Sequence, residues 1–342
     1  MPGNIKRHNH YVPEMYLKSW AIGNKIRTYT LLVPNEKCPV WKARSIEYSA
    51  SINNLYVRHD HGEERDDFEN DFARLYEAPA KVPLMKALGG LVLTSDDWDK
   101  LIDFIASQIV RTPAFYFKTQ EEMRKLLPEV IDSVAREIQF LTPEQIKKQN
   151  RRVPNEEIIL PITLDFTGVK ADEKSQYVKI TAVAGKTTWL FSIRHILKEV
   201  APILHQNRWS VVSAADGILW PTSDDPVICL NRYSNGSYDF NGAWGRQGTE
   251  IFLPISPTKG IYTQVGVAHP LSMVLSQEDS LLIKSIIVKH ALMYVYSCKN
   301  DEDIPLIRPR NVNLEEYNRI KREYEKWYET YQEDEVPYLN PQ

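Results

Sequence analysis

The sequence predicts an α+β fold that combines a mixed or antiparallel sheet with a helical middle segment and a C-terminal helix. Segments with strand-like alternation and segments with helical periodicity are interspersed, without the regular strand–helix–strand repeat of a doubly wound protein. A length of 342 residues allows one large domain or two ordinary ones. We expect a single domain over residues 1–342, with a candidate helical subdomain at 94–150 and a terminal helix at 314–331 followed by an acidic tail.

The N-terminal part is expected to mix short elements. Pro13 suits the first turn of a short helix, because the N–H that proline lacks has no helical partner there. Residues 26–33 have the pattern of a strand. Residues 66–88 have the pattern of a helix, which Pro79 and Pro83 should break or kink.

The rest of the chain is predicted as alternating helical and strand-rich regions. Ser95 is the expected N-cap of a helix with apolar residues at helical spacing. Residues 188–206 and a segment capped by Ser276 are expected to be helices as well. Between these two helices we expect several strands, among them residues 218–222, with a turn at Ala215-Asp216-Gly217.

Composition excludes several classes of protein. Hydrophobic residues make up 43% of the chain and the formal net charge is −3, which disfavours a protein that binds nucleic acid over its whole surface. No run of about 18 apolar residues occurs, so no membrane association is expected. The cysteines, Cys38, Cys229 and Cys298, have no zinc-like spacing and imply no disulfide framework. A reducing, cytoplasmic location fits this pattern best.

Ser223-Asp224-Asp225-Pro226 contains the most suggestive pair of carboxylates. It lies between two expected strands, where both side chains could project from a sheet edge and hold Mg²⁺ or Mn²⁺ for phosphodiester cleavage. Glu69, on the helix at 66–88, is a further candidate metal ligand. The alternative is a turn in which Asp224 accepts bonds from nearby backbone N–H groups. The Glu-x-Lys that a common metal-nuclease core carries on the following strand is missing here.

Three more polar residues are candidates for a catalytic role. His10 precedes the rigid Tyr11-Val12-Pro13 segment and could act as a general base, or simply pack near a helix start. Gln108 and Arg111 are three residues apart on one helix face. Arg111 could clamp a phosphate. Alternatively, its charge could interact favourably with the dipole at the C-terminal end of its helix.

Familiar sequence motifs are missing from the chain. There is no GxxxxGK[ST], GxGxxG, GxSxG or HExxH, so P-loop, dinucleotide-binding, α/β-hydrolase and zincin functions gain no support.

Several short blocks resemble, in order, the motifs of the domain of unknown function 4238 family. They are His10-Tyr11-Val12-Pro13 with Tyr16-Leu17, Gln108-x-x-Arg111-Thr112-Pro113 and Ser223-Asp224-x-Pro226-Val227. With intervening blocks, the resemblance covers about residues 9–297. The family typically has an aromatic residue where this chain has Met15, and Phe where it has Trp20, differences that concern packing.

The resemblance implies a mostly bacterial protein of unassigned activity. It also singles out a set of polar residues that coincides with the candidates above: His10, Gln108, Arg111, Ser223 and Asp224. These residues could line an active site, or they could form a buried network that holds the N-terminal segment on the core.

Two functional hypotheses follow. The first is a nuclease-like hydrolase of phosphodiesters, in a bacterial defence or toxin setting, with nucleic acid as substrate. Arg111 would hold phosphate, Asp224 and Asp225 would bind a metal or orient a base, and His10 would be the base. The second is a non-catalytic sensor or interaction module with a protein partner on the terminal helix, whose aromatic residues are Tyr317, Tyr324, Trp327, Tyr328 and Tyr331.

Overall fold

The computed structural model describes residues 5–60, 62–138, 162–165 and 179–339. Its largest sheet has the strand order β13–β12–β14–β15–β10–β16. The strands are Ser210–Ser213 (β10), Ile228–Arg232 (β12), Tyr238–Asp239 (β13), Glu250–Pro254 (β14), Lys259–Gln264 (β15) and Ser272–Val274 (β16). Neighbours are antiparallel except for β10 and β16. The predicted α+β class with mostly antiparallel sheets is confirmed.

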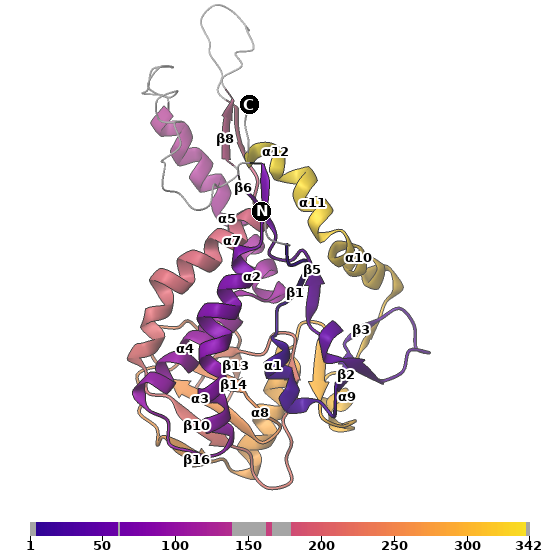
Figure 1. Ribbon diagram of the computed structural model, residues 1–342, viewed down its shortest axis with the longest axis vertical. Helices are drawn as coiled ribbons and strands as arrows, with labels where there is room; N and C mark the ends of the chain where they lie inside the picture. The colour runs from indigo at the N-terminus through magenta and orange to yellow at the C-terminus, as the bar shows by residue number, and fades with distance from the viewer. Residues whose placement is uncertain (1–4, 61, 139–161, 166–178, 340–342) are drawn as a thin grey trace, which may run out of the picture.

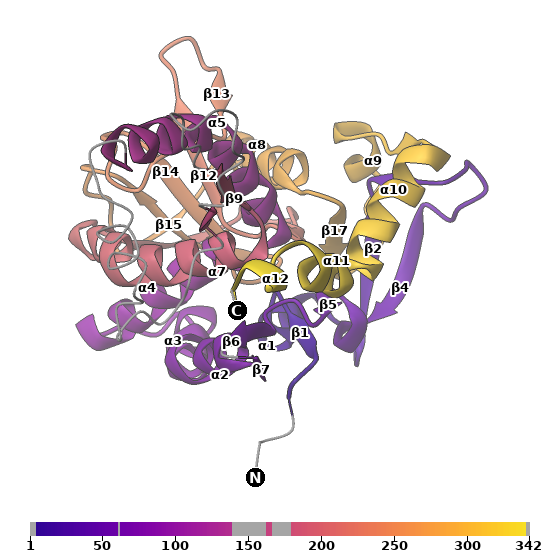
Figure 2. The same cartoon turned by 90° about the horizontal axis from the view of Figure 1, so that it is seen from above.

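A second sheet joins the two ends of the chain. Its order is β11–β17–β2–β4, and all its pairs are antiparallel. Figure 2 shows β2, β4 and β17 beside α10 and on the other side of the molecule from β14 and β15. The strands are Lys25–Thr30 (β2), Trp41–Ser45 (β4), Thr222–Ser223 (β11) and Tyr294–Ser297 (β17).

Four two-stranded pairs complete the strands of the described residues. They are His8–His10 (β1) with Ser51–Asn53 (β5), Leu32–Val33 (β3) with Asn311–Val312 (β18), Arg58–Asp60 (β6) with Glu63–Arg65 (β7), and Ile162–Asp165 (β8) with Lys179–Ala182 (β9).

The short N-terminal helix forms as predicted. Pro13 is the N-cap of Glu14–Leu17 (α1), which runs into the 3₁₀ turn Lys18–Trp20 (η1). The Tyr16 hydroxyl donates to the carbonyl of Pro254 (2.6 Å), and the Trp20 indole donates to the carbonyl of Trp220 (2.9 Å). These bonds fasten the N-terminal segment to the second half of the chain.

The helix expected over 66–88 is present but irregular. It consists of Asp67–Asp71 (α2), a π-helical stretch at Phe72–Glu77 (η3) and Ala78–Leu88 (α3). The irregularity thus precedes both prolines, and Pro83 lies inside α3. Ser95–Val110 (α4) is capped by Thr94 and not by Ser95, because Thr94 and Asp97 form a reciprocal capping box. Pro113–Ile138 (α5) follows.

The helix predicted at 188–206 changes its geometry twice. It consists of Lys186–His195 (α7), a π-helical stretch at Ile196–Val200 (η4) and the 3₁₀ segment Ala201–Gln206 (η5). Pro202 lies at the start of η5, where its missing N–H cannot continue an α-helical ladder.

The C-terminal half holds the remaining helices. Ser276 caps Gln277–His290 (α8) as predicted, accepting a bond from the N–H of Asp279 (3.0 Å). Asp303–Ile307 (α9) is followed by Leu314–Glu325 (α10), Trp327–Asp334 (α11) and Val336–Leu339 (α12). The expected helix at 314–331 is therefore interrupted at Lys326. Figure 1 shows these last three helices along one flank of the molecule.

One strand prediction was wrong. Residues 218–221 are not in a strand, and only Thr222 and Ser223 pair with β17. Trp220 explains the difference, because its N–H donates to the carbonyl of Pro257 (2.7 Å) and its indole to that of Ser280 (2.9 Å). The predicted turn before it is present, and Gly217 adopts a φ of 81° there.

One large hydrophobic cluster connects distant segments. It includes Trp20 near the N-terminus, Leu101 in α4, Trp189 in α7 and Trp327 in α11. The candidate helical subdomain at 94–150 and the terminal helix therefore both contribute to this cluster. Residues 139–150 lie outside the described part of the chain. Among the described residues, no helix combines the length and the apolar character needed to cross a bilayer.

Candidate functional site

Asp224 is buried and anchors the backbone. Its carboxylate accepts hydrogen bonds from the N–H groups of Leu292 (2.9 Å) and Met293 (2.7 Å), one on each oxygen. The N–H of Asp224 itself donates to the carbonyl of Tyr294 (3.1 Å). Burial raises the pKa of Asp224 to about 7, although the N–H groups favour the ionised form. The side chain thus joins β11 to the segment that leads into β17.

Asp225 faces the other way, toward a cavity and His290. One carboxylate oxygen accepts a bond from the Thr112 hydroxyl (3.2 Å), and the other lies 3.6 Å from the Nε2 of His290. The Nδ1 of His290 lies 3.0 Å from the backbone carbonyl of Asp225. Burial raises the pKa of the Asp225 carboxyl, which the His290 charge counteracts.

The arrangement of this pair brings an imidazole nitrogen within 3.6 Å of a carboxylate oxygen. A carbonyl can only accept, so the Nδ1 of His290 must carry the hydrogen of that bond. A neutral His290 would then present the lone pair of Nε2 to a carboxylate oxygen. Such a contact is favourable only when either His290 or Asp225 holds an additional proton. The pair is therefore poised for proton transfer.

The cavity beside the pair measures about 220 Å³. Phe115, Phe240 and Trp244 are among its aromatic walls, and the exposed Lys118 lies at its rim. The Phe240 and His290 rings meet edge to face at a centroid distance of 4.9 Å. Cys229 also lines the cavity, but burial raises the pKa of its thiol to about 12, so it is not a ready nucleophile.

Arg111 belongs to a closed network near the N-terminus. It is fully buried, and its guanidinium donates to Glu77 (2.7 Å) and to the backbone carbonyl of His10. The ring of Phe72 lies 4.3 Å from the guanidinium carbon. The Tyr56 hydroxyl donates to the carbonyl of Arg111 (2.7 Å). The Nε of Arg111 is buried without a hydrogen-bond partner in the described structure, but with the whole side chain buried a phosphate from solvent cannot reach it in the observed state.

Gln108 and His10 are also turned toward the protein. Gln108 is buried, and its side-chain amide donates to the Ser107 hydroxyl (3.3 Å), while its Oε1 has no partner. The Nε2 of His10 donates to the carbonyl of Glu47 (2.9 Å) and lies 3.7 Å from Glu14. Burial lowers the pKa of His10, so its neutral form prevails near pH 7.

Glu69 lies in the Arg111 network and not beside the Asp pair. Burial raises the pKa of its carboxyl, while the nearby Arg111 charge opposes this effect. Its Oε2 is buried without a hydrogen-bond partner in the described structure. Across the described ranges, no group of three or more His, Cys, Asp or Glu side chains is placed to hold a metal ion. Asp225, one of the expected metal ligands, lines the cavity of about 220 Å³.

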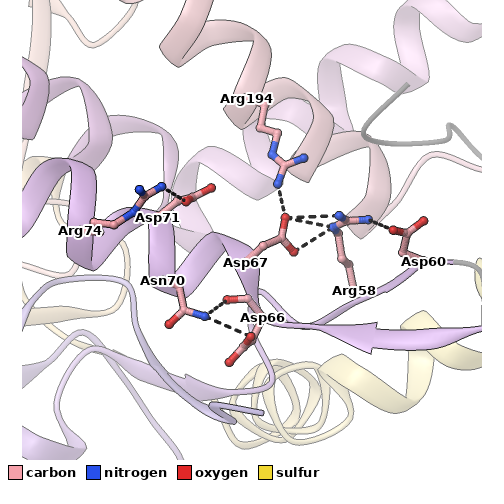
Figure 3. Close-up of polar contacts among 8 residues, drawn as sticks. All are labelled: Arg58, Asp60, Asp66, Asp67, Asn70, Asp71, Arg74 and Arg194. Carbon is pink, nitrogen blue, oxygen red and sulfur yellow. Dashed lines mark hydrogen bonds and ion pairs between the residues drawn. The ribbon is translucent and has the colours of Figure 1, made fainter. Parts of the chain in front are cut away.

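A second network fixes the neighbouring helices. Figure 3 shows Asp67 of α2 between Arg58 of β6 and Arg194 of α7. Arg58 donates to Asp67 at 3.0 Å, and Arg194 donates to the same carboxylate. The ion pairs connect α7 to the N-terminal segment that also contains the Arg111 network.

A larger cavity, of about 420 Å³, lies between the six-stranded sheet and α8. Its walls are mostly apolar, and two of its charged residues, Arg232 and Glu250, form an ion pair (2.6 Å). The Nε2 of His269 is buried there without a partner in the described structure. This cavity is suited to binding, but among its described lining residues there is no contact like that of His290 with Asp225.

The sequence did not point to His290, Lys118, Phe240 or Trp244. His290 ends the helix capped by Ser276, and a lone basic residue there is explained by the helix dipole. Phe240 and Trp244 follow β13, and no pattern in the sequence predicted that they would line a common cavity.

Comparison with known proteins supports the resemblance seen in the sequence. The model of the family described as "Protein of unknown function (DUF4238)" matches residues 8–301. A search of curated proteins and a search of solved structures gave no significant match. Because the match covers most of the chain, the protein belongs to the DUF4238 family.

Proposed function

We propose that this chain is a hydrolase of phosphodiesters, in the bacterial cytoplasm, and that Asp225 and His290 form its acid–base pair. The observation that supports it most directly is the 3.6 Å contact between the Nε2 of His290 and the Asp225 carboxylate at the edge of a cavity. General acid–base catalysis needs one protonated and one unprotonated group beside the substrate. The defence or toxin setting expected from the sequence is part of the same proposal.

The other walls of the cavity fit a nucleotide. Every base has a face that can stack on an aromatic ring, and Phe240 and Trp244 offer such rings. Lys118 places a cation at the rim for a phosphate. In RNA, the unprotonated partner would take the 2′-hydroxyl proton, the oxygen would attack phosphorus, and the leaving 5′-oxygen would take the proton of the other partner.

Cleavage of fluorescent RNA and DNA oligonucleotides tests the proposal, each with Mg²⁺, Mn²⁺ or EDTA. The 2′-hydroxyl route predicts that RNA is cut in EDTA while DNA is not. A metal route through Asp225 predicts that both are cut only with a divalent ion. We expect Asp225→Asn and His290→Ala to lower kcat/KM about 10²–10⁴-fold.

His205→Ala is the matched control. His205 contacts Asp99 (3.1 Å) and Asp103 (2.9 Å) at the surface, so it reproduces a His–Asp contact outside the cavity. Its loss should leave cleavage unchanged. Full activity of both cavity variants, or no cleavage under any of these conditions, would contradict the proposal.

A non-catalytic sensor or interaction module is the second candidate. It is favoured by the closed contacts of Arg111 and Asp224, which account for the shared polar residues without chemistry. A partner on the terminal helix would have to use other residues than Trp327 and Tyr331, because both are buried in this chain. This candidate predicts that the cavity binds a nucleotide without turnover.

A further inference from the structure

The first turn of α7 holds a carboxylate that comes from the end of the chain. The backbone N–H of Lys186 donates to one oxygen of Glu335 (2.6 Å), and that of Thr187 donates to the other (2.7 Å). Glu335 is only 4% exposed. Free N–H groups and the helix dipole make such a turn an anion-binding site, and here the anion is part of the protein.

Gly185 provides the space for this anion. A Cβ atom at Gly185 would lie 2.2 Å from Oε1 of Glu335, which is closer than two non-bonded heavy atoms approach each other. The φ of Gly185 is −159°, which any residue can adopt, so glycine is needed for space and not for conformation. The backbone is thus open at the point where the anion approaches.

The site offers more than a carboxylate uses. The Thr187 hydroxyl is buried beside Glu335 and Tyr331 and lowers the pKa of both groups, yet it has no hydrogen-bond partner of good geometry in the described structure. A carboxylate has two oxygens, and both are taken by backbone N–H groups. A phosphate has a further oxygen, which the Thr187 hydroxyl can reach.

A buried amine lies at the same turn. The Lys186 ammonium donates to the carbonyl of Asn54 (2.8 Å) and faces the Tyr331 ring at 4.6 Å. Burial lowers the pKa of Lys186 to about 7, against the attraction of Glu335. A dianion in place of Glu335 would favour the charged amine.

α7 is held in place without Glu335. Arg194 near its end pairs with Asp67 (Figure 3), and the Trp189 indole donates to the carbonyl of Val110 (3.1 Å). Loss of the Glu335 contact should therefore open the turn without moving the helix. The turn lies inside the span matched by the family model, whereas Glu335 lies beyond it.

We propose that the turn Gly185-Lys186-Thr187 is a binding site for one phosphate group, and that Glu335 occupies it when the C-terminal segment is docked. The site is separate from the Asp225–His290 cavity and does not depend on its activity. The position five residues before Gly185, which is glycine in a P-loop, is Ile180. A single phosphate group is therefore assigned, and not a triphosphate.

Calorimetric titration of the full chain with inorganic phosphate tests the site. Glu335→Ala should bind phosphate at least tenfold more tightly than the wild-type chain. Glu333→Ala is the matched control, because Glu333 is an exposed carboxylate two residues away, and it should bind like the wild type. Equal affinity of the two variants would overturn the proposal.

Two further titrants define the ligand. Acetate should bind Glu335→Ala more weakly than phosphate does, and acetate binding as tight as phosphate binding would overturn the assignment to phosphate. Adenosine monophosphate distinguishes the source, provided that only the binding to Glu335→Ala that Gly185→Ala abolishes is counted, because the Asp225–His290 cavity is also proposed to bind a nucleotide. If it binds at least as tightly as phosphate, the site takes a phosphate monoester; if phosphate alone binds, the site takes the free ion, and either result supports the proposal.

Gly185→Ala, added to Glu335→Ala, checks the geometry. The new methyl group would fill the position of the anion, so phosphate binding should be lost, and retained binding would overturn the proposal. If Glu335→Ala does not fold, Glu335→Gln keeps one acceptor oxygen. Phosphate should then raise the melting temperature of Glu335→Gln more than that of Glu333→Ala, and an equal rise would overturn the proposal.

Discussion

Two buried charged residues, Arg111 and Asp224, are each followed in the chain by a residue of the Asp225–Thr112 contact beside the cavity. At the end of α4, Arg111 turns into the closed network, while the hydroxyl of Thr112 reaches Asp225. At the turn after β11, Asp224 binds backbone N–H groups, while Asp225 faces His290. In each segment, one residue holds the fold and the next contributes to the cavity.

The difference teaches that a polar residue in a family motif need not be a site residue. A buried charge whose partners all belong to the chain stabilises one arrangement of segments. A charge with a partner across a cavity can interact with a ligand. Substitutions at Arg111 and Asp224 should therefore lower mainly stability. Substitutions at Thr112 and Asp225 should lower mainly activity.

The largest effect is expected for Arg111→Met. This change leaves the Glu77 carboxylate and the His10 carbonyl without their buried partner. Loss of one member of a buried ion pair costs about 3–5 kcal/mol. Chemical denaturation of the variant should show a loss of this size. If the variant instead has wild-type stability but no longer cleaves substrate, Arg111 would have a role in the catalytic site.

Arg74→Met is the control for this experiment. Arg74 is exposed on η3 and pairs with Asp71 at the surface (3.3 Å). Such pairs contribute little, so its unfolding free energy should change by less than about 0.5 kcal/mol.

Asp224→Asn and Asp225→Asn should differ in kind. At Asp224, the new amide group would face a backbone N–H that needs an acceptor, which costs about 1–3 kcal/mol. At Asp225, asparagine can still accept from Thr112 but cannot share a proton with His290. We expect Asp224→Asn to lower stability and Asp225→Asn to lower activity. If both variants lose the same amount of stability, the assignment of a structural role to Asp224 and a catalytic role to Asp225 is wrong.

The smallest expected effect concerns the pH dependence at His10. Burial lowers the pKa of His10 in the folded chain, so the unfolded chain binds the proton more readily between that pKa and the ordinary value of about 6.5. The contribution of His10 to the free energy of unfolding therefore falls as pH decreases through this window. His10→Gln should reduce the loss of stability between about pH 7 and 5, by less than about 1 kcal/mol. Urea unfolding at several pH values measures it, and an unchanged or steeper loss would argue against a buried neutral His10.

Local signals predicted the elements whose ends are determined by their own residues. Ser276 is the N-cap of α8 and Pro13 is the N-cap of α1, because both effects act within one turn of helix. The prediction was wrong where a distant contact competes with the local pattern. Residues 218–221 resemble a strand, but Trp220 binds the carbonyls of Pro257 and Ser280. The terminal helix breaks at Lys326, next to Trp327, whose indole donates to the carbonyl of Leu55 (3.3 Å).

The candidate site was predictable only in part. Asp225 was among the residues selected from the sequence, because adjacent carboxylates between two expected strands could both project from a sheet edge. Its partner His290 is 65 residues away in the chain, and nothing in its own neighbourhood indicates a site. Glu335 and Gly185 are a similar case, since an acidic tail and a Gly-Lys-Thr turn have no common sequence signal.

The sequence by itself determined the fold class, the family, most helix starts and the list of polar residues worth testing, because periodicity, caps and motif order are local properties of the chain. Only the tertiary structure decided which of those residues are closed off and which face a cavity. That outcome depends on burial and on hydrogen-bond partners from distant segments. Asp224 and Asp225 have the same side chain and adjacent positions, and it is their partners, the backbone N–H groups before β17 and the His290 imidazole, that separate them.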